Sequence, residues 1–339
     1  MGVQGLAGAA ILAVTTLGLC QGPAPAESEL ARAVALRPKD PVAHSRYGVF
    51  LQQEGRGIEA IAHFRTALEL NPRSTEHSYN LALALLHDGR AGEALAVLDK
   101  YPAAGADQFA LRGAVLNALG RTPEAADALR RAVTLDANNP DSLYDLALTL
   151  LKVDASAEAA ALLDPGRRRF PRVAKLHAAA GMVAYLHGKN TEAVSAYEAA
   201  VRLEPGGADL FAALGDVYDA TGDLARAESA YRKSLSLASV AAVHVKLGRN
   251  LMKLQRSREA ETAFAAALRR DATQAEAHFQ LGKLASARGE HNAAISHFQQ
   301  AVAATPSLKE AWYQLGVSYR RMGQEEQSLA ALEQFKKLP

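Results

Sequence analysis

The chain has 339 residues, of which 49% are hydrophobic and 22% are charged, and its formal net charge is +2. So small a net charge argues against a nucleic-acid partner, because nucleic-acid-binding domains are usually strongly basic. The only cysteine is Cys20, which excludes an internal disulfide. No stretch alternates polar and apolar residues over the length of a strand, so the sequence predicts an all-α protein.

Residues 1–26 carry no charged side chain, and the apolar stretch Leu6–Leu19 has the length of a signal-peptide core. Ala24-Pro25-Ala26 fits a cleavage site of small residues. We therefore predict an export signal at 1–26 and a periplasmic or secreted mature protein that begins near Glu27. Because no Lys or Arg precedes the apolar stretch, three alternatives stay open: an uncleaved membrane anchor, a lipidated Cys20, and a first repeat helix. Only the first two would bring the protein into contact with a membrane.

After residue 26 the sequence repeats with a period of about 34 residues. A half unit at 27–40 precedes nine full units, which are numbered one to nine below. They start at Pro41, Thr75, Ala106, Pro140, Ala174, Ala208, Ala241, Ala275 and Lys309. The ninth unit shows the pattern most fully, as Trp312-x-x-Leu315-Gly316-x-x-Tyr319. A fixed period of this length is typical of small helical units that bury their apolar faces only by stacking on one another.

These residues resemble the tetratricopeptide repeat (TPR) family over about residues 27–339. The resemblance implies a right-handed α-solenoid of stacked antiparallel helix pairs, with a capping helix at 27–40 and one solenoid domain at 41–339. Unit two is three residues short and unit six one residue short. Pro102 and Pro165 lie in the second helices of units two and four. Both helices are expected to end early, because proline lacks an amide hydrogen and clashes with the preceding turn.

Small residues recur at two places in the unit. One set, in the first helix, lets the two helices of a unit approach closely: Gly48, Ala82, Gly113, Gly181, Gly215, Gly248, Gly282 and Gly316. A second set supplies the turn between the helices, where a positive φ costs little only for glycine: Gly55, Gly89, Gly120, Gly188, Gly222, Gly289 and Gly323. Large residues such as Phe64, Phe264 and Phe298 are expected to fill the space toward the next unit.

Sequence motifs for catalysis are missing. There is no glycine-rich phosphate loop, no Gly-x-Ser-x-Gly elbow and no His-Glu-x-x-His. His44, His177, His244 and His278 share one unit position, where other units carry Phe, Leu or Trp, so we interpret them as wedges between helices. His291 and His297 are six residues apart and lie on different helix faces. The sequence therefore predicts no enzyme, no cofactor and no metal site.

In proteins of this family the first helix of each unit lines a concave inner face. Here the corresponding positions are apolar and aromatic in the middle of the chain, at Tyr79, Leu83, Tyr144, Leu148, Met182 and Tyr185. They become acidic in unit six, at Asp209, Asp216 and Asp219, and basic in units seven to nine, at Lys246, Arg249, Lys253, Lys283, Arg320 and Arg321. An apolar stripe beside charged groups favours a peptide-binding groove. The alternative is that several of these side chains pack against neighbouring helices.

A second set of polar residues occupies one shared position of the first helix, at Asn80, Asp145, Gln280 and Gln314. In some proteins of this type a polar residue there holds the backbone of an extended peptide, a task that suits side chains able to donate and accept. The Lys/Asn pair that clamps a partner's C-terminal carboxylate in chaperone-binding relatives is not reproduced in consecutive units.

Together these patterns predict a non-enzymatic protein-interaction scaffold in a bacterial envelope or secreted complex, which binds an extended peptide or a partner surface in its groove. The alternative is a regulatory or targeting subunit of a separate glycosyltransferase or other enzyme. A basic cluster at Arg167–Arg169 and Arg172 is interpreted as a solvated loop or as a contact for an acidic partner. The sequence does not predict an oligomeric state.

Overall fold

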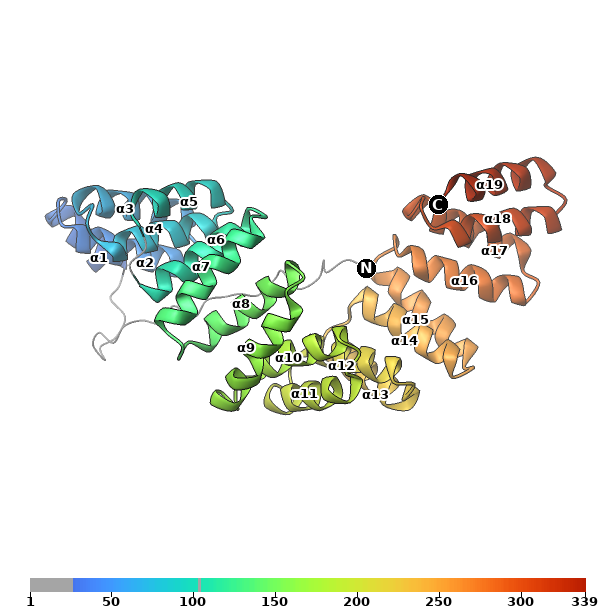
Figure 1. The fold of residues 1–339 in the computed structure, drawn as a ribbon. Helices are drawn as coiled ribbons and strands as arrows, with labels where there is room; N and C mark the ends of the chain where they lie inside the picture. The colour runs from blue at the N-terminus through green and yellow to red at the C-terminus, as the bar shows by residue number, and fades with distance from the viewer. Residues whose placement is uncertain (1–26, 103–104) are drawn as a thin grey trace. The chain divides into compact units, whose positions relative to one another are not determined.

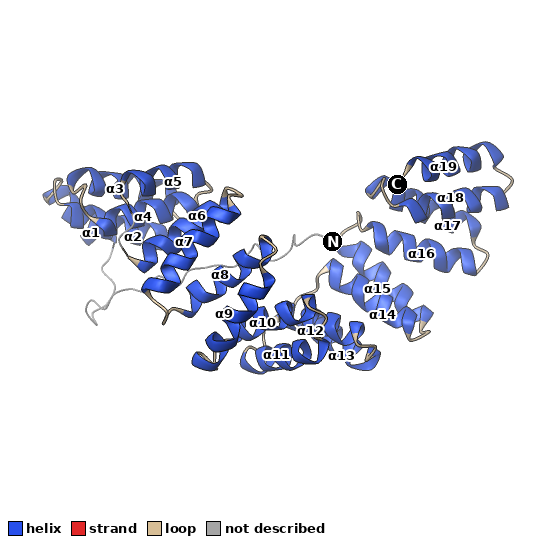
Figure 2. Cartoon of the chain, in the orientation of Figure 1, coloured by secondary structure: helices blue, strands red, loops and turns tan. Residues whose placement is uncertain are grey.

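The computed structural model describes residues 27–102 and 105–339. These residues form nineteen α-helices and no strand, as Figure 2 shows, and this confirms the all-α prediction. None of the described helices is both long enough and apolar enough to cross a membrane. The export signal predicted at 1–26 and the alternatives involving Cys20 lie outside the described residues.

Helices alternate along the chain as successive antiparallel pairs (Figure 1). α1 (Glu27–Leu36) is followed by α2 (Pro41–Gln53) and α3 (Gly57–Leu70) in unit one, and by α4 (Thr75–His87) and α5 (Ala91–Lys100) in unit two. Units three to six comprise α6 (Ala106–Ala118), α7 (Thr122–Leu135), α8 (Pro140–Lys152), α9 (Ser156–Arg169), α10 (Ala174–Leu186), α11 (Asn190–Leu203), α12 (Ala208–Ala220) and α13 (Leu224–Leu237). Units seven to nine comprise α14 (Ala241–Lys253), α15 (Ser257–Arg270), α16 (Ala275–Ala287), α17 (His291–Ala304), α18 (Lys309–Arg321) and α19 (Glu325–Lys337).

The chain divides into two compact bodies, one ending at Ala104 and one beginning at Gly105. Units one and two belong to the first body and units three to nine to the second. The single solenoid domain that the sequence predicted over 41–339 stays a prediction. The division follows α5, which has 10 residues where α3 and α7 have 14 each.

The two prolines in second helices act differently. α5 ends at Lys100, before Pro102, as expected. α9 continues through Pro165 to Arg169, so the prediction that it ends early is wrong. Pro165 and Ala161, one turn earlier, are both exposed. Water can therefore satisfy the Ala161 carbonyl that loses its helical partner, which lowers the cost of a proline inside the helix.

Within each glycine-containing unit, a large side chain from the second helix lies directly on the glycine of the first. A Cβ atom added to Gly215 would lie 2.6 Å from Cε1 of Tyr231, and one added to Gly48 would lie 2.8 Å from Cε1 of Phe64. The same contact joins Gly113 to Leu129, Gly181 to Tyr197, Gly248 to Phe264, Gly282 to Phe298 and Gly316 to Leu332. The large residues were expected to face the next unit, whereas they lie first against the glycine of their own unit.

The turn between the two helices of a unit requires a left-handed backbone conformation. All seven glycines predicted there have φ between 70° and 80°. Units four and seven make the same turn with Asp154 (φ 57°) and Gln255 (φ 61°). A non-glycine residue in this conformation costs roughly 1–2 kcal/mol. The turn geometry is therefore imposed by the packing of the two helices even where glycine is missing.

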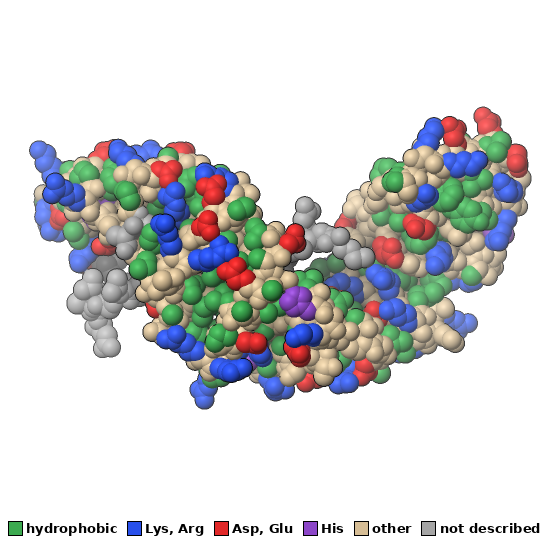
Figure 3. All heavy atoms as spheres, in the orientation of Figure 1, with side chains coloured by type: hydrophobic (Ala, Val, Ile, Leu, Met, Phe, Trp, Pro, Cys, Tyr) green, Lys and Arg blue, Asp and Glu red, His purple; other side chains and the backbone are tan. Residues whose placement is uncertain are grey.

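Arg and Glu side chains form a repeated ion pair at the start of the second helices. Arg56 pairs with Glu59 at 2.6 Å, and Arg90 with Glu93 at 2.7 Å. The same spacing joins Arg121 to Glu124 and Arg256 to Glu259. Figure 3 shows that acidic and basic side chains are interspersed on the surface. These pairs are exposed, so each contributes little to stability.

Candidate partner-binding surface

The predicted contact residues lie on first helices, and most of them are accessible. Tyr79, Asn80 and Leu83 belong to the first body, and the other predicted residues belong to the second. Leu83 is only 6% exposed, so its side chain packs in the core. The others are half-buried or exposed. We call the side chains of α8, α10, α12, α14, α16 and α18 that lie outside the core the first-helix surface.

The aromatic and aliphatic residues predicted in units four and five differ in how much of each side chain is accessible to a partner. Tyr144 packs against the core formed by units three to five, and the ammonium of Lys175 lies 5.1 Å from its ring centre. Met182 packs against the core of units five to eight. Leu148 is half-buried. Tyr185 is 39% exposed and is the most accessible of these four side chains.

The four polar residues that share one unit position have different surroundings. Asn80 donates to Ser45 Oγ at 3.3 Å, and Gln280 donates to Glu276 Oε1 at 2.8 Å. Burial raises the pKa of the Asp145 carboxyl, against the opposing effect of the nearby Lys175 ammonium. Gln314 lines a cavity described below. A shared position therefore does not give these residues one common role.

The acidic side chains of unit six pair with the basic side chains of unit seven. Lys246 Nζ lies 2.6 Å from Asp216 Oδ2, and Lys253 Nζ lies 2.5 Å from Asp219 Oδ2. The buried Asn250 amide also donates to Asp219, at 3.4 Å. Both lysines, which were predicted to face a peptide-binding groove, are thus already engaged by α12. Arg249, between them on α14, is exposed and forms no ion pair with the part of the chain that the structure describes.

Two buried tyrosines from second helices lie across first-helix glycines in units five and six. Tyr231 lies across Gly215, and its hydroxyl donates to Asp216 Oδ1 at 2.9 Å. Tyr197 lies across Gly181 in the same way. Burial, reinforced by the Asp216 carboxylate, raises the pKa of both phenols. The residues predicted to contact a partner did not include these two tyrosines. The sequence did contain one signal for them. Units five and six carry tyrosine at the position that lies on the glycine, where units one, seven and eight carry phenylalanine.

An aromatic cavity of about 410 Å³ opens on the first-helix surface of units eight and nine. Phe279 and Lys283 from α16, Glu310, Tyr313 and Gln314 from α18, and Phe335 from α19 line it. Tyr313 is 45% exposed, and its ring centre lies 5.4 Å from that of Phe335. The ammonium of Lys283 lies 5.5 Å from the ring centre of Phe279. Hereafter this site is called the aromatic cavity.

Lys283 and Gln314 were predicted from the sequence as groove residues, but the three rings of the aromatic cavity were not. Phe279 and Tyr313 occupy the same unit position as Tyr79 and Tyr144, so the repeat itself carried this signal. Phe335 lies on a second helix, and the repeat gave no reason to place it on the first-helix surface. Arg320, which was also predicted, is exposed at the end of α18.

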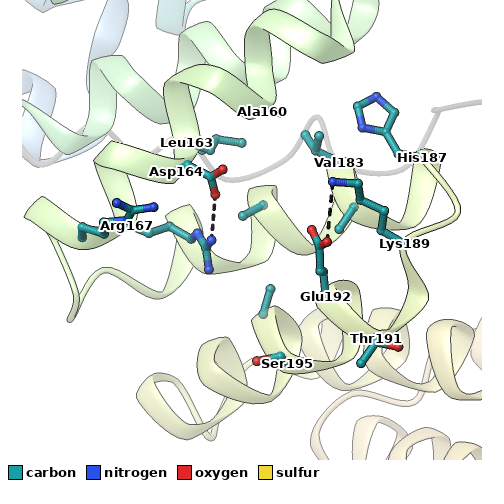
Figure 4. A pocket seen from close by; sticks show the side chains of 14 residues that line it. Ala160, Leu163, Asp164, Arg167, Val183, His187, Lys189, Thr191, Glu192 and Ser195 are labelled. Atoms are coloured by element: carbon teal, nitrogen blue, oxygen red, sulfur yellow. Dashed lines mark hydrogen bonds and ion pairs between the residues drawn. The ribbon is translucent and has the colours of Figure 1, made fainter.

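A second cavity, of about 510 Å³, lies between α9, α10 and α11 (Figure 4). It contains two ion pairs, Arg167 with Asp164 at 2.8 Å and Lys189 with Glu192 at 3.5 Å, and Arg168 also lines it. Arg169, from the same basic cluster, donates to Asn138. Two of the cations that line this cavity are therefore already paired with carboxylates.

Comparisons with known proteins agree with this architecture. A family model described as "Tetratricopeptide repeat" matches residues 51–109, 144–208, 178–242 and 245–309, which together exceed half of the chain. Two further models with the same description match residues 310–338 and 109–131. No curated protein matches the sequence.

Two solved structures with TM-scores above 0.5 are similar in fold. The APC/C heterotetramer Cut9–Hcn1 has a TM-score of 0.57 at 18% identity, and the match covers 86% of this chain and 58% of that one. A tetratricopeptide repeat protein from Parabacteroides merdae has a TM-score of 0.54 at 16% identity, covering 72% of this chain and 93% of that one. At these identities the likeness concerns the fold alone. The family models carry the conclusion: this chain belongs to the tetratricopeptide repeat family, whose members are protein–protein interaction scaffolds.

Proposed function

We propose that the chain binds an extended segment of a partner protein along the first-helix surface of units five to nine. A large apolar or aromatic side chain of the partner occupies the aromatic cavity, and acidic residues beside it lie near Arg249 and Lys283. The observation that carries the proposal is the aromatic cavity itself. It joins three rings, the Lys283 ammonium, the Glu310 carboxylate and one amide on a surface where Lys246 and Lys253 are already paired.

The charges and rings of this surface suit such a ligand. Buried aromatic anchors usually supply most of the free energy of binding at protein interfaces. Arg249, Lys283 and Arg320 are exposed cations on α14, α16 and α18. A partner carboxylate near them needs no rearrangement of the Asp216 and Asp219 ion pairs. Tyr185, exposed on α10, extends the contact surface toward unit five.

Binding kinetics test the proposal once a partner has been recovered from the native host by affinity capture and mass spectrometry. Tyr313→Ala should mainly speed dissociation, because it removes a ring that a partner side chain would cover. Arg249→Glu should mainly slow association, and more strongly at low salt, because an exposed charge acts at long range. We expect at least a tenfold loss of affinity for Tyr313→Ala.

Two variants serve as matched controls for these kinetic measurements. Arg258→Glu reverses an exposed charge on α15, and Leu135→Ala shortens a 56% exposed apolar residue on α7. Both positions lie on second helices, so both variants should bind as the parent does. Equal binding by Tyr313→Ala, Arg249→Glu and the parent, with all variants folded by circular dichroism, would exclude the first-helix surface as the binding site.

We further propose that the protein acts outside the cytoplasm, in an envelope or secreted complex. The support is the uncharged apolar segment at 1–26 and its small-residue cleavage site. N-terminal sequencing of protein from the native host should find a first residue near Glu27. A soluble cytosolic protein that starts at Met1 would contradict export.

A further inference from the structure

Two histidine pairs with the same geometry occur in units one and eight. His44 of α2 faces His63 of α3, and His278 of α16 faces His297 of α17. The facing atoms are Nδ1 in all four rings, 3.0 Å apart in the first pair and 3.2 Å apart in the second. From the sequence we interpreted His44 and His278 as wedges between helices, and we predicted no contact with His63 or His297.

The surroundings of each pair decide which nitrogen carries the proton. His44 Nε2 lies 3.1 Å from the Pro38 carbonyl oxygen, and His278 Nε2 lies 3.1 Å from that of Ala272. A carbonyl oxygen can only accept, so Nε2 of both rings must donate. In the neutral ring Nδ1 then carries a lone pair, and that lone pair points at the second histidine.

We propose that each pair is a binding site for one divalent transition-metal ion of the Zn²⁺ or Cu²⁺ class, held between the two Nδ1 atoms. Imidazole nitrogens suit these ions. Two nitrogens at about 2.0–2.1 Å from a tetrahedral zinc ion lie roughly 3.3–3.4 Å apart. The two Nδ1 atoms of a pair therefore need to separate by a few tenths of an ångström, and both rings must turn by roughly 35° so that their lone pairs meet at the ion. A metal-binding histidine commonly donates its other ring N–H to a backbone carbonyl, as His44 and His278 do.

The proton balance of this step is simple. Before binding, His63 donates its Nδ1 hydrogen to His44; on binding, that hydrogen moves to His63 Nε2 and the Nδ1 lone pair meets the ion. His297 makes the same change beside His278. No cluster of three or more His, Cys, Asp or Glu forms a metal centre in the described ranges 27–102 and 105–339. Each pair therefore supplies two ligands, and water completes the coordination.

The groups around the second histidine favour its neutral form. Burial lowers the pKa of His63, and the neighbouring His44 lowers it further, against the opposing charge of Glu59. Burial and His278 likewise lower the pKa of His297, against Glu261. The two carboxylates are also held by Arg56 and Arg288.

Unit five contains half of the same arrangement and provides an internal comparison. His177 occupies the position of His44, and its Nε2 lies 3.1 Å from the Pro171 carbonyl oxygen. Its Nδ1 is buried without a hydrogen-bond partner among the described residues. The residue nineteen positions later, where units one and eight have the second histidine, is Ala196. Unit five should therefore lack the site and should gain it with one added histidine.

Calorimetric titration of the untagged full chain with Zn²⁺ tests the proposal. His63→Ala and His297→Ala should each lose one bound ion relative to the parent, and the double variant should lose two. His187→Ala, which removes a histidine outside the pairs, should lose none. Ala196→His should gain one ion by completing the site with His177.

The outcomes separate a metal site from a structural hydrogen bond. The loss of two ions in a double variant that is still folded by circular dichroism supports the proposal. The same stoichiometry in the parent and the double variant overturns it, and the pairs then serve only to satisfy buried nitrogens. A folded Ala196→His variant that gains no ion would also count against it. All of these results are independent of peptide binding, so they leave the proposed function untouched.

Discussion

Gly215→Leu is expected to lower the free energy of unfolding by about 3 kcal/mol or more, because overpacking a close helix contact forces the backbones apart. Even a Cβ atom at residue 215 would lie 2.6 Å from Cε1 of Tyr231 and 2.7 Å from Cδ1, and a leucine adds three further carbons. The ring cannot simply move away, since its hydroxyl is bonded to Asp216. Chemical denaturation measures the loss.

Amide hydrogen exchange should locate the damage from Gly215→Leu. Tyr231 belongs to a core that runs continuously from Ala184 to Leu284, through units five to eight. Exchange should therefore rise across those units and stay unchanged in α1–α5, because an array transmits strain mainly between neighbours.

Gly92→Leu provides the matched control for this prediction. Gly92 is also a helical glycine, in α5, but no atom lies within 4 Å of the position its Cβ would take. Leucine is the better helix former by roughly 0.5–1 kcal/mol, so this variant should be no less stable than the parent. If Gly215→Leu proved as stable as Gly92→Leu, Gly215 would not lie at a close helix contact.

The second large effect is expected from the pair Gly248 and Phe264, because the chain itself contains two versions of this contact. A Cβ on Gly248 would lie 2.6 Å from Cε1 of Phe264, so Gly248→Ala alone should cost about 1–3 kcal/mol. Units two and four carry alanine at this position, and there the facing residue is leucine: Ala82 with Leu98, and Ala147 with Leu163. Alanine and leucine together are thus a combination that the fold accepts.

A double-mutant cycle tests this interpretation. Phe264→Leu should destabilise the protein by itself, since Phe264 is fully buried and the smaller side chain leaves a cavity. In the double variant Gly248→Ala/Phe264→Leu, the new methyl group occupies part of that cavity. The double variant should therefore lose less stability than the sum of the single changes, by about 1–3 kcal/mol. Strict additivity of the two free-energy changes would mean that the two residues do not compete for the same space.

The features that were predicted correctly are those with one local cause. The first helix of each unit starts where the 34-residue pattern places it, and the seven turn glycines have the expected positive φ. α5 ends at Lys100, before Pro102. Proline lacks an amide hydrogen and clashes with the preceding turn, and nothing offsets that cost at Pro102. Pro165 was the exception, because its place on an exposed face of α9 depends on packing that the pattern does not contain.

The candidate site was only partly predictable, since it depends on which side chains meet between units. The repeat pattern placed Lys246 and Lys253 on a first helix, but it did not predict their pairing with Asp216 and Asp219, which lie thirty and thirty-four residues earlier. Such contacts follow from distances between neighbouring helices, which no single unit encodes.

The sequence by itself determined the all-α repeat, its period, the close glycine contacts and the family. Each of these depends on steric rules that act within one unit, and nine copies repeat the signal. Only the tertiary structure decided which charges are paired, where three rings form the aromatic cavity and which histidines face one another. Those features depend on which side chains meet across two helices, within one unit for the histidine pairs and between units for the Lys–Asp ion pairs and the aromatic cavity. The free energy of a polar group there depends on the partner it meets, and the residue type alone does not reveal that partner.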